Sequence, residues 1–319
     1  MKVFRSLPPP DKREPCALTI GNFDGVHRGH QVLLGSLVAQ ARRDGLVSCV
    51  LTFEPHPREF FAGDKAAPVR IANLRDKLEA LAALGIDRVC VAHFNHTLAA
   101  TSPKDFVEQI LSKGLHTRRL LIGDDFRFGA RRAGDIQMLQ DAGRRFGFHV
   151  ETLPAVMHGA QRISSSAVRA ALAEGDFART SELLGHPYTM SGHVIHGQKL
   201  GRTLGFPTLN LRVVHRPALS GIFVVQVHGL ADRPLPAVAS LGVRPTVEDA
   251  GRMLLEVHLF DFAQSCYGKL VRVEFLAKLR DEEKYGDLAT LTAAIDRDAA
   301  QARAFFAHRN GALTATDRI

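Results

Sequence analysis

Apolar and polar residues follow two different spacings in the first half of the chain. Short apolar runs of strand length occur at 16–21, 47–53, 88–93, 119–122 and 149–153. Between these runs, apolar residues recur at helical spacing over roughly 29–43, 74–84, 103–113 and 135–146. Strands that alternate with helices in this way predict a parallel sheet covered by helices on both faces.

The pattern changes after residue 185, where helical spacing stops. Five strand-like runs follow, separated by turn residues, at 190–196, 221–228, 237–241, 254–262 and 270–279, and a closing helix is expected over 288–306. Short strands of this kind predict a small antiparallel β-barrel or sandwich, of which we expect the barrel. We therefore expect an α/β + β protein: a Rossmann-like parallel sheet at residues 1–185, then a barrel with a C-terminal helix at 187–310. Residues 309–319 are expected to form a frayed tail.

Composition narrows the class of protein. The 319 residues suffice for two domains, and 45% hydrophobic with 23% charged residues is typical of a globular chain. No apolar run approaches the ~18 residues of a membrane span, and the N-terminus lacks the apolar core of a signal peptide. The scattered cysteines are expected to be reduced in a cytoplasmic protein; they are Cys16, Cys49, Cys90 and Cys266.

The net charge of +8 is compatible with anionic partners. Lysines and arginines are interspersed along the chain and do not form a continuous run. We therefore expect small phosphate-bearing ligands, with no nucleic-acid or membrane partner and at most a weak homo-oligomer.

The stretch GNFDGVHRGH, residues 21–30, joins the first predicted strand to the first predicted helix. A strand, a tight turn and a helix start present backbone N–H groups and the positive end of a helix dipole, which suit a phosphate. His27 and His30 should face the same side of the first helical turn, and Gly29 between them lets a ligand approach. We predict that both histidines donate to charge on a polyphosphate. The alternatives are a zinc site that includes Asp24 and a purely structural turn.

The segment ISSSAVR, residues 163–169, is typical of a serine cap that opens a short helix. Ser165 and Ser166 offer hydroxyl groups, and Arg169 adds a planar cation one turn later. A simple helix cap explains such a segment when it stands alone. In combination with the histidine turn, it favours a second half of a phosphate site.

Together these two motifs resemble the nucleotidylyltransferase superfamily. Four stretches in order, namely GNFDGVHRGH, TFEPHP at 52–57, GDDFRFG at 123–129 and ISSSAVR, are similar to the FMN adenylyltransferase module of bacterial FAD synthetases. Ser166 stands where that family often has threonine, so the hydroxyl is kept. The resemblance implies that the phosphate of FMN attacks the α-phosphorus of ATP and releases pyrophosphate, without a protein nucleophile.

The resemblance also implies roles for individual residues. His27 and His30 would serve the phosphates, and Ser165, Ser166 and Arg169 would lie on the β/γ side. The remaining residues expected in this ATP site are Asn22, Asp24, Gly29 and Asp125, of which Asn22 and Asp125 would orient nucleotide or metal. Aromatic residues expected either to contact the flavin or only to pack are Phe23, Phe126 and Phe128.

A glycine-rich run at 192–211 is the informative part of the second half. Gly197 and Gly201 belong to a loop whose N–H groups could wrap phosphates, although the spacing is not that of a Walker A loop. Thr208 and Asn210 are two residues apart, so in an extended segment they point the same way. A hydroxyl and an amide oxygen are hard ligands that suit Mg²⁺, although a turn also explains this segment. Glu256 lies on a later strand-like run, where a surface acid is the alternative.

The patterns GxxxGxxxGFPTxN, GVRPT, ExHLxDF and YGK resemble riboflavin kinase. The resemblance implies that Glu256 is the general base for the ribityl hydroxyl, while Thr208 and Asn210 hold Mg-ATP. Leu209 replaces the alanine common in that family, and its side chain should point away from its two neighbours. Both resemblances together imply that the C-terminal domain converts riboflavin to FMN and the N-terminal domain converts FMN to FAD, each with ATP.

Three other functions stay open at this point. One is an enzyme with a single activity, such as a nucleotidyltransferase whose second domain is degenerate. Another is a relative of class I aminoacyl-tRNA synthetases, but TMSG at 189–192 is a poor substitute for their KMSKS loop. The third is a basic protein that binds nucleic acid or flavin without catalysis, which the absence of Trp and the presence of only three Tyr make less attractive.

Overall fold

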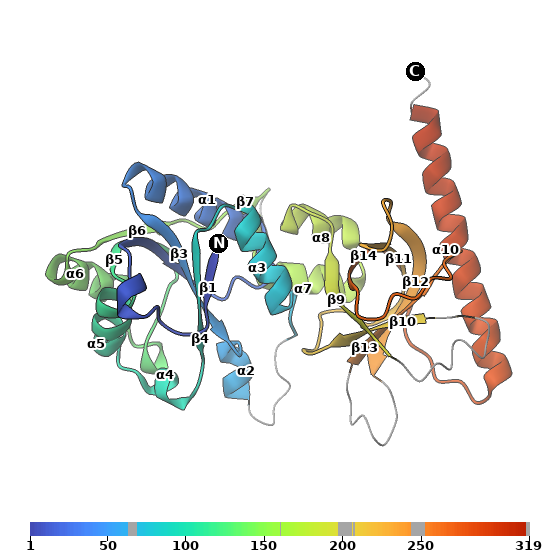
Figure 1. Ribbon diagram of the computed structural model, residues 1–319, viewed down its shortest axis with the longest axis horizontal. Helices are drawn as coiled ribbons and strands as arrows, with labels where there is room; N and C mark the ends of the chain where they lie inside the picture. The colour runs from blue at the N-terminus through green and yellow to red at the C-terminus, as the bar shows by residue number, and fades with distance from the viewer. Residues whose placement is uncertain (63–68, 160, 197–205, 207, 244–252, 317–319) are drawn as a thin grey trace. The chain divides into compact units, whose positions relative to one another are not determined.

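The computed structural model describes residues 1–62, 69–159, 161–196, 206, 208–243 and 253–316. The chain divides into two compact units, which we call the first and the second unit (Figure 1). The first unit comprises Met1–Pro68 and Leu74–Ser165, and the second comprises Val69–Asn73 and Ser166–Ile319. The expected domain boundary at 185–187 stays a prediction.

A six-stranded sheet forms the centre of the first unit, with the order β1-β4-β3-β2-β5-β6. All neighbouring strands are parallel, which confirms the predicted sheet. The short edge strand β1 was not predicted. The strands are β1 (Lys2–Phe4), β2 (Cys16–Ile20), β3 (Val47–Glu54), β4 (Arg88–His93), β5 (Thr117–Gly123) and β6 (His149–Leu153).

Helices cover both faces of this sheet. One face packs against α1 (Arg28–Arg43) and α3 (Leu74–Ala83). The other packs against the π-helix η2 (Phe106–Gly114) and α6 (Ile136–Phe146). Successive strand residues point to opposite faces, so Leu18 and Ile20 belong to one core and Ala17 to the other. The shorter helical elements are η1 (Pro10–Lys12), α2 (Pro57–Ala62), α4 (His96–Ala100), α5 (Pro103–Asp105) and η3 (Ala130–Arg132).

The strand order reverses direction next to β2. The chain runs from β2 to its neighbour β3, continues outward to β4, and later returns to β5 on the other side of β2. Ligands of such sheets bind in the crevice at the carboxyl ends of the strands where the order reverses. The loops that follow β2 and β5 lie at this crevice, and both carry residues selected from the sequence.

The second unit contains a closed barrel with the order β10-β13-β12-β11-β14-β9, which confirms the predicted barrel. All of its strand pairs are antiparallel. Strand β10 was not among the predicted strands, because its apolar run is broken by polar residues. The strands are β9 (Thr189–Ile195), β10 (Thr208–Val213), β11 (Gly221–His228), β12 (Leu235–Val243), β13 (Met253–Leu259) and β14 (Leu270–Arg280).

Helix α10 (Leu288–Thr316) packs on the outside of the barrel along β11 and β12 (Figure 1). Arg280 on β14 donates from Nε and Nη2 to the Asp298 carboxylate of α10, at 2.9 and 2.7 Å. The expected frayed tail is wrong for 309–316, which are helical. The remaining elements are β7 (Met157–His158), β8 (Gln161–Arg162), α7 (Ser165–Glu174) and α8 (Phe177–Leu184).

The four cysteines form no disulfide in this structure, and their reduced state in a cytoplasmic protein stays a prediction. Cys16, Cys49 and Cys90 are buried in the sheet core of the first unit. Among the described helices, none combines the length and the apolar character that crossing a membrane requires.

Candidate functional site

The turn after β2 builds the first candidate site. Its backbone is tightly coiled, because Phe23, Gly25 and Val26 have φ angles of 47°, 79° and 40°. Positive φ is costly for residues other than glycine and is frequent at functional sites. The turn is held by Thr52, whose hydroxyl donates to the carbonyl of Asn22 at 3.3 Å. The turn leads directly into the first turn of α1, which begins at Arg28.

His27 and His30 lie face to face at the start of α1. Their ring centroids are 3.6 Å apart and the rings are nearly parallel, at 16°. His27 is the N-cap residue of the helix and accepts a hydrogen bond from the His30 backbone N–H through Nδ1, at 3.3 Å. The structure therefore brings the two predicted histidines together. It also uses Nδ1 of His27 to cap helix α1.

The environment keeps His30 uncharged. Burial first, then the charges of His27 and Lys77, lower the pKa of His30 well below its ordinary value. Its Nδ1 atom is buried and has no hydrogen-bond partner within the described chain. The same holds for Oδ1 of Asn22, which lies at the same turn. Such atoms are costly to leave unsatisfied, so this turn is suited to a polar ligand.

Gly29 has a more specific role than access for a ligand. A Cβ atom at this position would lie 3.2 Å from both Cε1 and Nδ1 of His27. It would also lie 3.4 Å from the carbonyl oxygen of Ile163. The absence of a side chain therefore allows the His27 ring to lie against the backbone of its own helical turn.

The serine-rich segment reaches this turn through Ser165. The Ser165 hydroxyl donates to the carbonyl oxygen of Asp24 at 3.2 Å, and the Asp24 side chain is itself buried. Ser166 and Arg169 follow on α7 and are assigned to the second unit. Nε of Arg169 donates to the carbonyl of Val69 at 2.8 Å.

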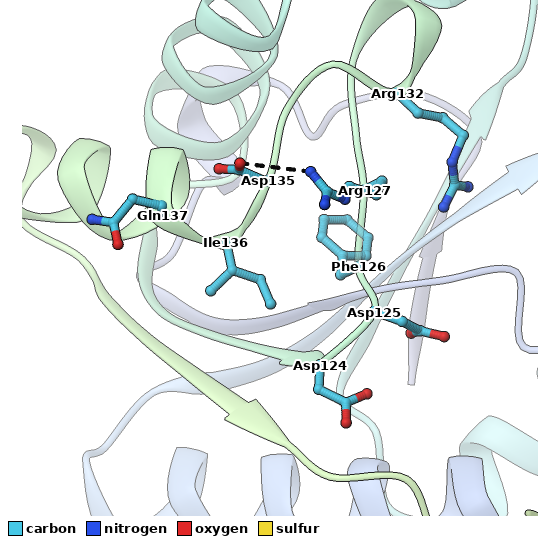
Figure 2. A pocket seen from close by; sticks show the side chains of 8 residues that line it. All are labelled: Asp124, Asp125, Phe126, Arg127, Arg132, Asp135, Ile136 and Gln137. Atoms are coloured by element: carbon cyan, nitrogen blue, oxygen red, sulfur yellow. Dashed lines mark ion pairs between the residues drawn. The ribbon is translucent and has the colours of Figure 1, made fainter.

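The loop after β5 borders a cavity of about 460 Å³ (Figure 2). Arg127 and Asp135 both line it, and the Arg127 guanidinium forms an ion pair with the Asp135 carboxylate at 3.6 Å. Asp125 is exposed and forms an ion pair with Arg162 of β8 at 2.9 Å. The complete lining is Asp124, Asp125, Phe126, Arg127, Arg132, Asp135, Ile136 and Gln137.

The three aromatic residues expected near a flavin differ in exposure. Phe23 is only 1% exposed and meets the His30 ring edge-on at 5.1 Å. Phe128 is buried against Phe106. Phe126 is only partly buried, stacks on Phe128 with 6.0 Å between centroids, and lines the cavity. Burial of Phe23 and Phe128 agrees with the packing role that we considered as their alternative.

A second aromatic group was missed in the sequence. Phe53, Phe60, Phe61, Phe94 and His96 lie at the carboxyl ends of β3 and β4, and we call them the aromatic cluster. Phe60 meets Phe94 at 5.3 Å and His96 at 4.8 Å between centroids. Phe61 is 67% exposed although its ring contacts Phe94 at 5.7 Å. A pair of adjacent phenylalanines directly after the TFEPHP turn was the available sequence signal.

The second candidate site lies on strands β10 and β13 of the barrel. Asn210 is the direct cross-strand partner of Glu256, and Thr208 is the partner of His258. Partners across an antiparallel pair point to the same face. The structure therefore brings together the predicted Mg²⁺ ligands and the predicted general base, which are far apart in the sequence.

Asn210 is buried, at 4% exposure, and its Oδ1 has no hydrogen-bond partner among the described residues. Leu209 between the two predicted ligands is buried and is paired with Val257 on the opposite face of the strand. The replacement of alanine by leucine thus leaves the polar face unchanged. Gly197 and Gly201, predicted to wrap phosphates, lie outside the described residues.

A further acid reaches the same face of the barrel. Ser240 on β12 is the cross-strand partner of Glu256, and Gly242 follows two residues later on that face. A Cβ atom at Gly242 would overlap the carboxylate of Glu282. Glu282 therefore lies against the barrel wall on the side that carries Glu256. No sequence pattern indicated this approach, because it depends on the segment after β14.

Metal chemistry at the histidine turn is not supported by its geometry. In the described part of the chain, no group of three or more His, Cys, Asp or Glu side chains could hold a metal ion. The stacked rings of His27 and His30 present their faces to one another, whereas metal ligands converge through ring nitrogens.

Two family models match successive parts of the chain, in the order in which the two sets of motifs occur. Residues 10–167 match the family model described as FAD synthetase, and residues 184–306 match the one described as riboflavin kinase. These two regions include the proposed residues of both candidate sites except Arg169, which follows the first region by two residues.

Curated relatives match almost the whole chain. A bifunctional riboflavin kinase/FMN adenylyltransferase of Escherichia coli (strain K12) is 46% identical over 92% of this chain and 94% of its own. The protein of the same name from Haemophilus influenzae is 48% identical over 91% and 94%. The one from Pseudomonas fluorescens is 46% identical over 92% and 93%.

One solved structure is similar over nearly the full length. It is a Streptococcus pneumoniae protein named as a macrolide-efflux protein, with a TM-score of 0.73 and 28% identity, covering 93% of this chain and 96% of its own. The likeness shows that both units are found in one chain elsewhere.

Proposed function

The chain belongs to the family of bifunctional riboflavin kinase/FMN adenylyltransferases, and on that premise we propose which residues carry each reaction. The protein is an enzyme that phosphorylates riboflavin to FMN with ATP and converts FMN to FAD with a second ATP. We assign the kinase reaction to the barrel and the adenylyl transfer to the parallel sheet.

In the kinase reaction, Glu256 accepts the proton of the terminal ribityl hydroxyl, whose oxygen attacks the γ-phosphorus of ATP while ADP leaves. The support is the cross-strand pairing of Glu256 with Asn210. Thr208 and Asn210 would hold Mg²⁺, since the buried amide oxygen of Asn210 has no partner among the described residues. When bound, the ion would neutralise charge on the phosphates. Gly197 and Gly201 are proposed for the same phosphates.

In the adenylyl transfer, an oxygen of the FMN phosphate attacks the α-phosphorus of ATP, and the bond to the β-phosphate breaks to release pyrophosphate. Positioning and charge stabilisation supply the catalysis. Burial, His27 and Lys77 lower the pKa of His30, so we propose that its neutral ring donates one hydrogen bond to the phosphates and brings no charge. We assign the phosphates to His27, His30 and the backbone around Gly29, with Ser165, Ser166 and Arg169 on the β/γ side.

Asn22, Asp24 and Asp125 complete the proposed nucleotide site of the first unit. Asn22 offers a buried amide oxygen that no described residue contacts with a hydrogen bond, and the Asp24 side chain is buried at the residue whose carbonyl accepts from Ser165. Asp125 lies at the rim of the cavity and would have to release Arg162 to contact a ligand.

We expect the flavin ring to stack on aromatic side chains at the carboxyl edge of the parallel sheet, beside the proposed phosphate site. Phe126 lines the cavity after β5, and the aromatic cluster with exposed Phe61 lies after β3 and β4. An offset stack on such rings contributes roughly 0.5–1.5 kcal/mol beyond area burial. We propose the aromatic cluster and Phe126 as the flavin contacts, with Phe23 and Phe128 supporting them from the core.

The observation that carries this proposal is that three of the six unsatisfied buried side-chain atoms in the described chain fall in the two sites. Asn22 Oδ1 and His30 Nδ1 lie in the first site and Asn210 Oδ1 in the second. Polar atoms of this kind indicate groups that complete their hydrogen bonds on a ligand. Cytoplasmic location, weak self-association and independence from nucleic acids and membranes stay predictions from composition.

The direct test is to incubate the protein with riboflavin and Mg-ATP and separate the flavins by chromatography over time. We expect FMN to appear first and FAD to follow, with pyrophosphate formed in step with FAD. The proposal is wrong if neither flavin product forms with oxidised or with reduced riboflavin.

A further inference from the structure

Lys77 is buried in the first unit, with only 3% of its surface exposed. Lysine is rarely buried to this extent, because its ammonium group loses hydration. Lys77 and Leu81 are one turn apart on α3 and are its two buried residues, so they share the side that faces the core. None of the roles proposed above for the two reactions involves Lys77.

The fold directs this side chain toward the histidine turn. Leu81 packs in the same core as Leu34 and Leu37 of α1. Both helices follow parallel strands, so both begin at the carboxyl edge of the sheet. Lys77 lies one turn closer to that edge than Leu81, and helical side chains lean toward the N-terminus of their helix. Its ammonium group is therefore directed to the edge where His27 and His30 lie.

The electrostatics agree with this placement. The charge of Lys77 is one of the causes that lower the pKa of His30, together with burial and His27. An uncharged His30 donates a hydrogen bond but brings no positive charge to the phosphates. Adenylyl transfer builds negative charge on the α-phosphate and on departing pyrophosphate, and a nearby buried cation would offset it strongly.

We propose that Lys77 is a phosphate-binding residue of the adenylyl-transfer site, whose ammonium group contacts the ATP phosphates while pyrophosphate leaves. Lys77 stays protonated throughout: the new bond joins an FMN phosphate oxygen to the α-phosphorus, and the broken bond frees the β-phosphate oxygen. This inference rests on the proposed function of the first unit.

The test compares Lys77→Met, which keeps the length without charge, with Lys77→Arg and the wild type. We expect Lys77→Met to lower kcat/KM for ATP in FMN adenylylation by roughly 10²–10³-fold, and Lys77→Arg to recover part of the loss. Riboflavin phosphorylation in the same preparations is expected to stay at the wild-type rate. Arg75→Met is the matched control, because Arg75 is on the same helix but its side chain is 46% exposed.

A pH profile shows whether the loss of rate comes from removing a charge beside the histidine turn or only from loosened packing. The groups that act on His30 are His27 on its own turn and Lys77 on α3. Removal of the Lys77 charge should therefore raise the pKa of His30 and shift the acid limb of kcat/KM to higher pH. A variant that only loosened the core would lower the rate without moving this limb.

The experiment distinguishes a wrong assignment of Lys77 from a wrong proposed function. If the wild type makes no FAD, the proposed function is wrong. If the wild type is active and Lys77→Met stays within about threefold of it, the assignment of Lys77 is overturned while the function stands. Should the methionine variant not fold, judged by its unfolding transition, Lys77→Gln is measured in its place with the same limits.

Discussion

Buried polar atoms without a partner connect stability to function at the scale of single residues. Among the described residues, six side chains carry one such atom; those of Asn22, His30 and Asn210 belong to the candidate sites, and those of Thr19, Gln40 and Arg88 do not. An unsatisfied buried group costs about 1–3 kcal/mol. A ligand that satisfies these atoms recovers this energy. We therefore expect these side chains to lower the stability of the ligand-free enzyme and to raise its affinity for the ligand.

Asn210→Ala tests this connection in the barrel. The alanine removes the buried amide oxygen, so we expect the melting temperature to stay within about 2 °C of wild type or to rise. Riboflavin phosphorylation should nevertheless fall by at least about tenfold, because a proposed Mg²⁺ ligand is lost. Thermal unfolding and the rate of FMN formation are measured on the same samples. Strong destabilisation together with an unchanged rate would contradict the assignment.

His30 predicts how stability depends on pH. Its folded-state pKa is lowered by burial, His27 and Lys77, so the unfolded chain binds a proton more readily. Stability from neutral His30 is therefore complete above the ordinary histidine pKa of about 6.5 and is lost as pH falls toward the folded value. His30→Gln should show a smaller fall in the free energy of unfolding between about pH 7 and pH 5. Equal pH dependence in both proteins would be incompatible with a buried neutral His30.

Helices and strands of the first unit follow closely from sequence patterns. Apolar runs and helical spacing predicted five of the six sheet strands, because β2, β3, β4 and β5 are largely buried and β6, although more exposed, keeps apolar residues among its polar ones. Strand β1 was missed because Lys2–Phe4 is too short and too exposed to show a pattern. The aromatic cluster was missed for another reason: its members come from three separate segments that only the sheet order brings together.

The barrel contains features that patterns in a single sequence cannot predict. Strand β10 escaped prediction because Thr208 and Asn210 occupy its polar face and a glycine-rich run precedes it. The relation between Asn210 and Glu256 depends on register, which no local pattern contains. Only the family resemblance connected these residues before the fold was known.

Gly29→Ala tests the start of helix α1 as an element. The new Cβ atom would press on the His27 ring at 3.2 Å, so the stacked pair should separate and FMN adenylylation should fall roughly tenfold or more. Riboflavin phosphorylation is expected to continue.

Gly35→Ala is the matched control on the same helix, since a Cβ atom there meets nothing within 4 Å. It should leave both activities unchanged and stabilise the helix by roughly 0.5–1 kcal/mol. A loss of adenylylation in the control, or none in Gly29→Ala, would show that the contact with His27 does not position the ring.

The molecule consists of two compact units, and we propose one candidate site for each of the two reactions. The family models match these regions in the same order, and curated relatives carry both activities in their name. The two reactions share FMN as product and substrate. The central claim of this account is that each reaction has its own site, with Glu256 serving only the first and His30 only the second.

The most direct measurement follows flavins by chromatography in Glu256→Gln and His30→Ala, starting either from riboflavin or from FMN. Glu256→Gln should form FMN about 10²–10⁴-fold more slowly while still converting supplied FMN to FAD at the wild-type rate. His30→Ala should accumulate FMN from riboflavin and form little FAD from either substrate. Equal loss of both reactions in either variant, or normal FAD formation by His30→Ala, would contradict two separate sites.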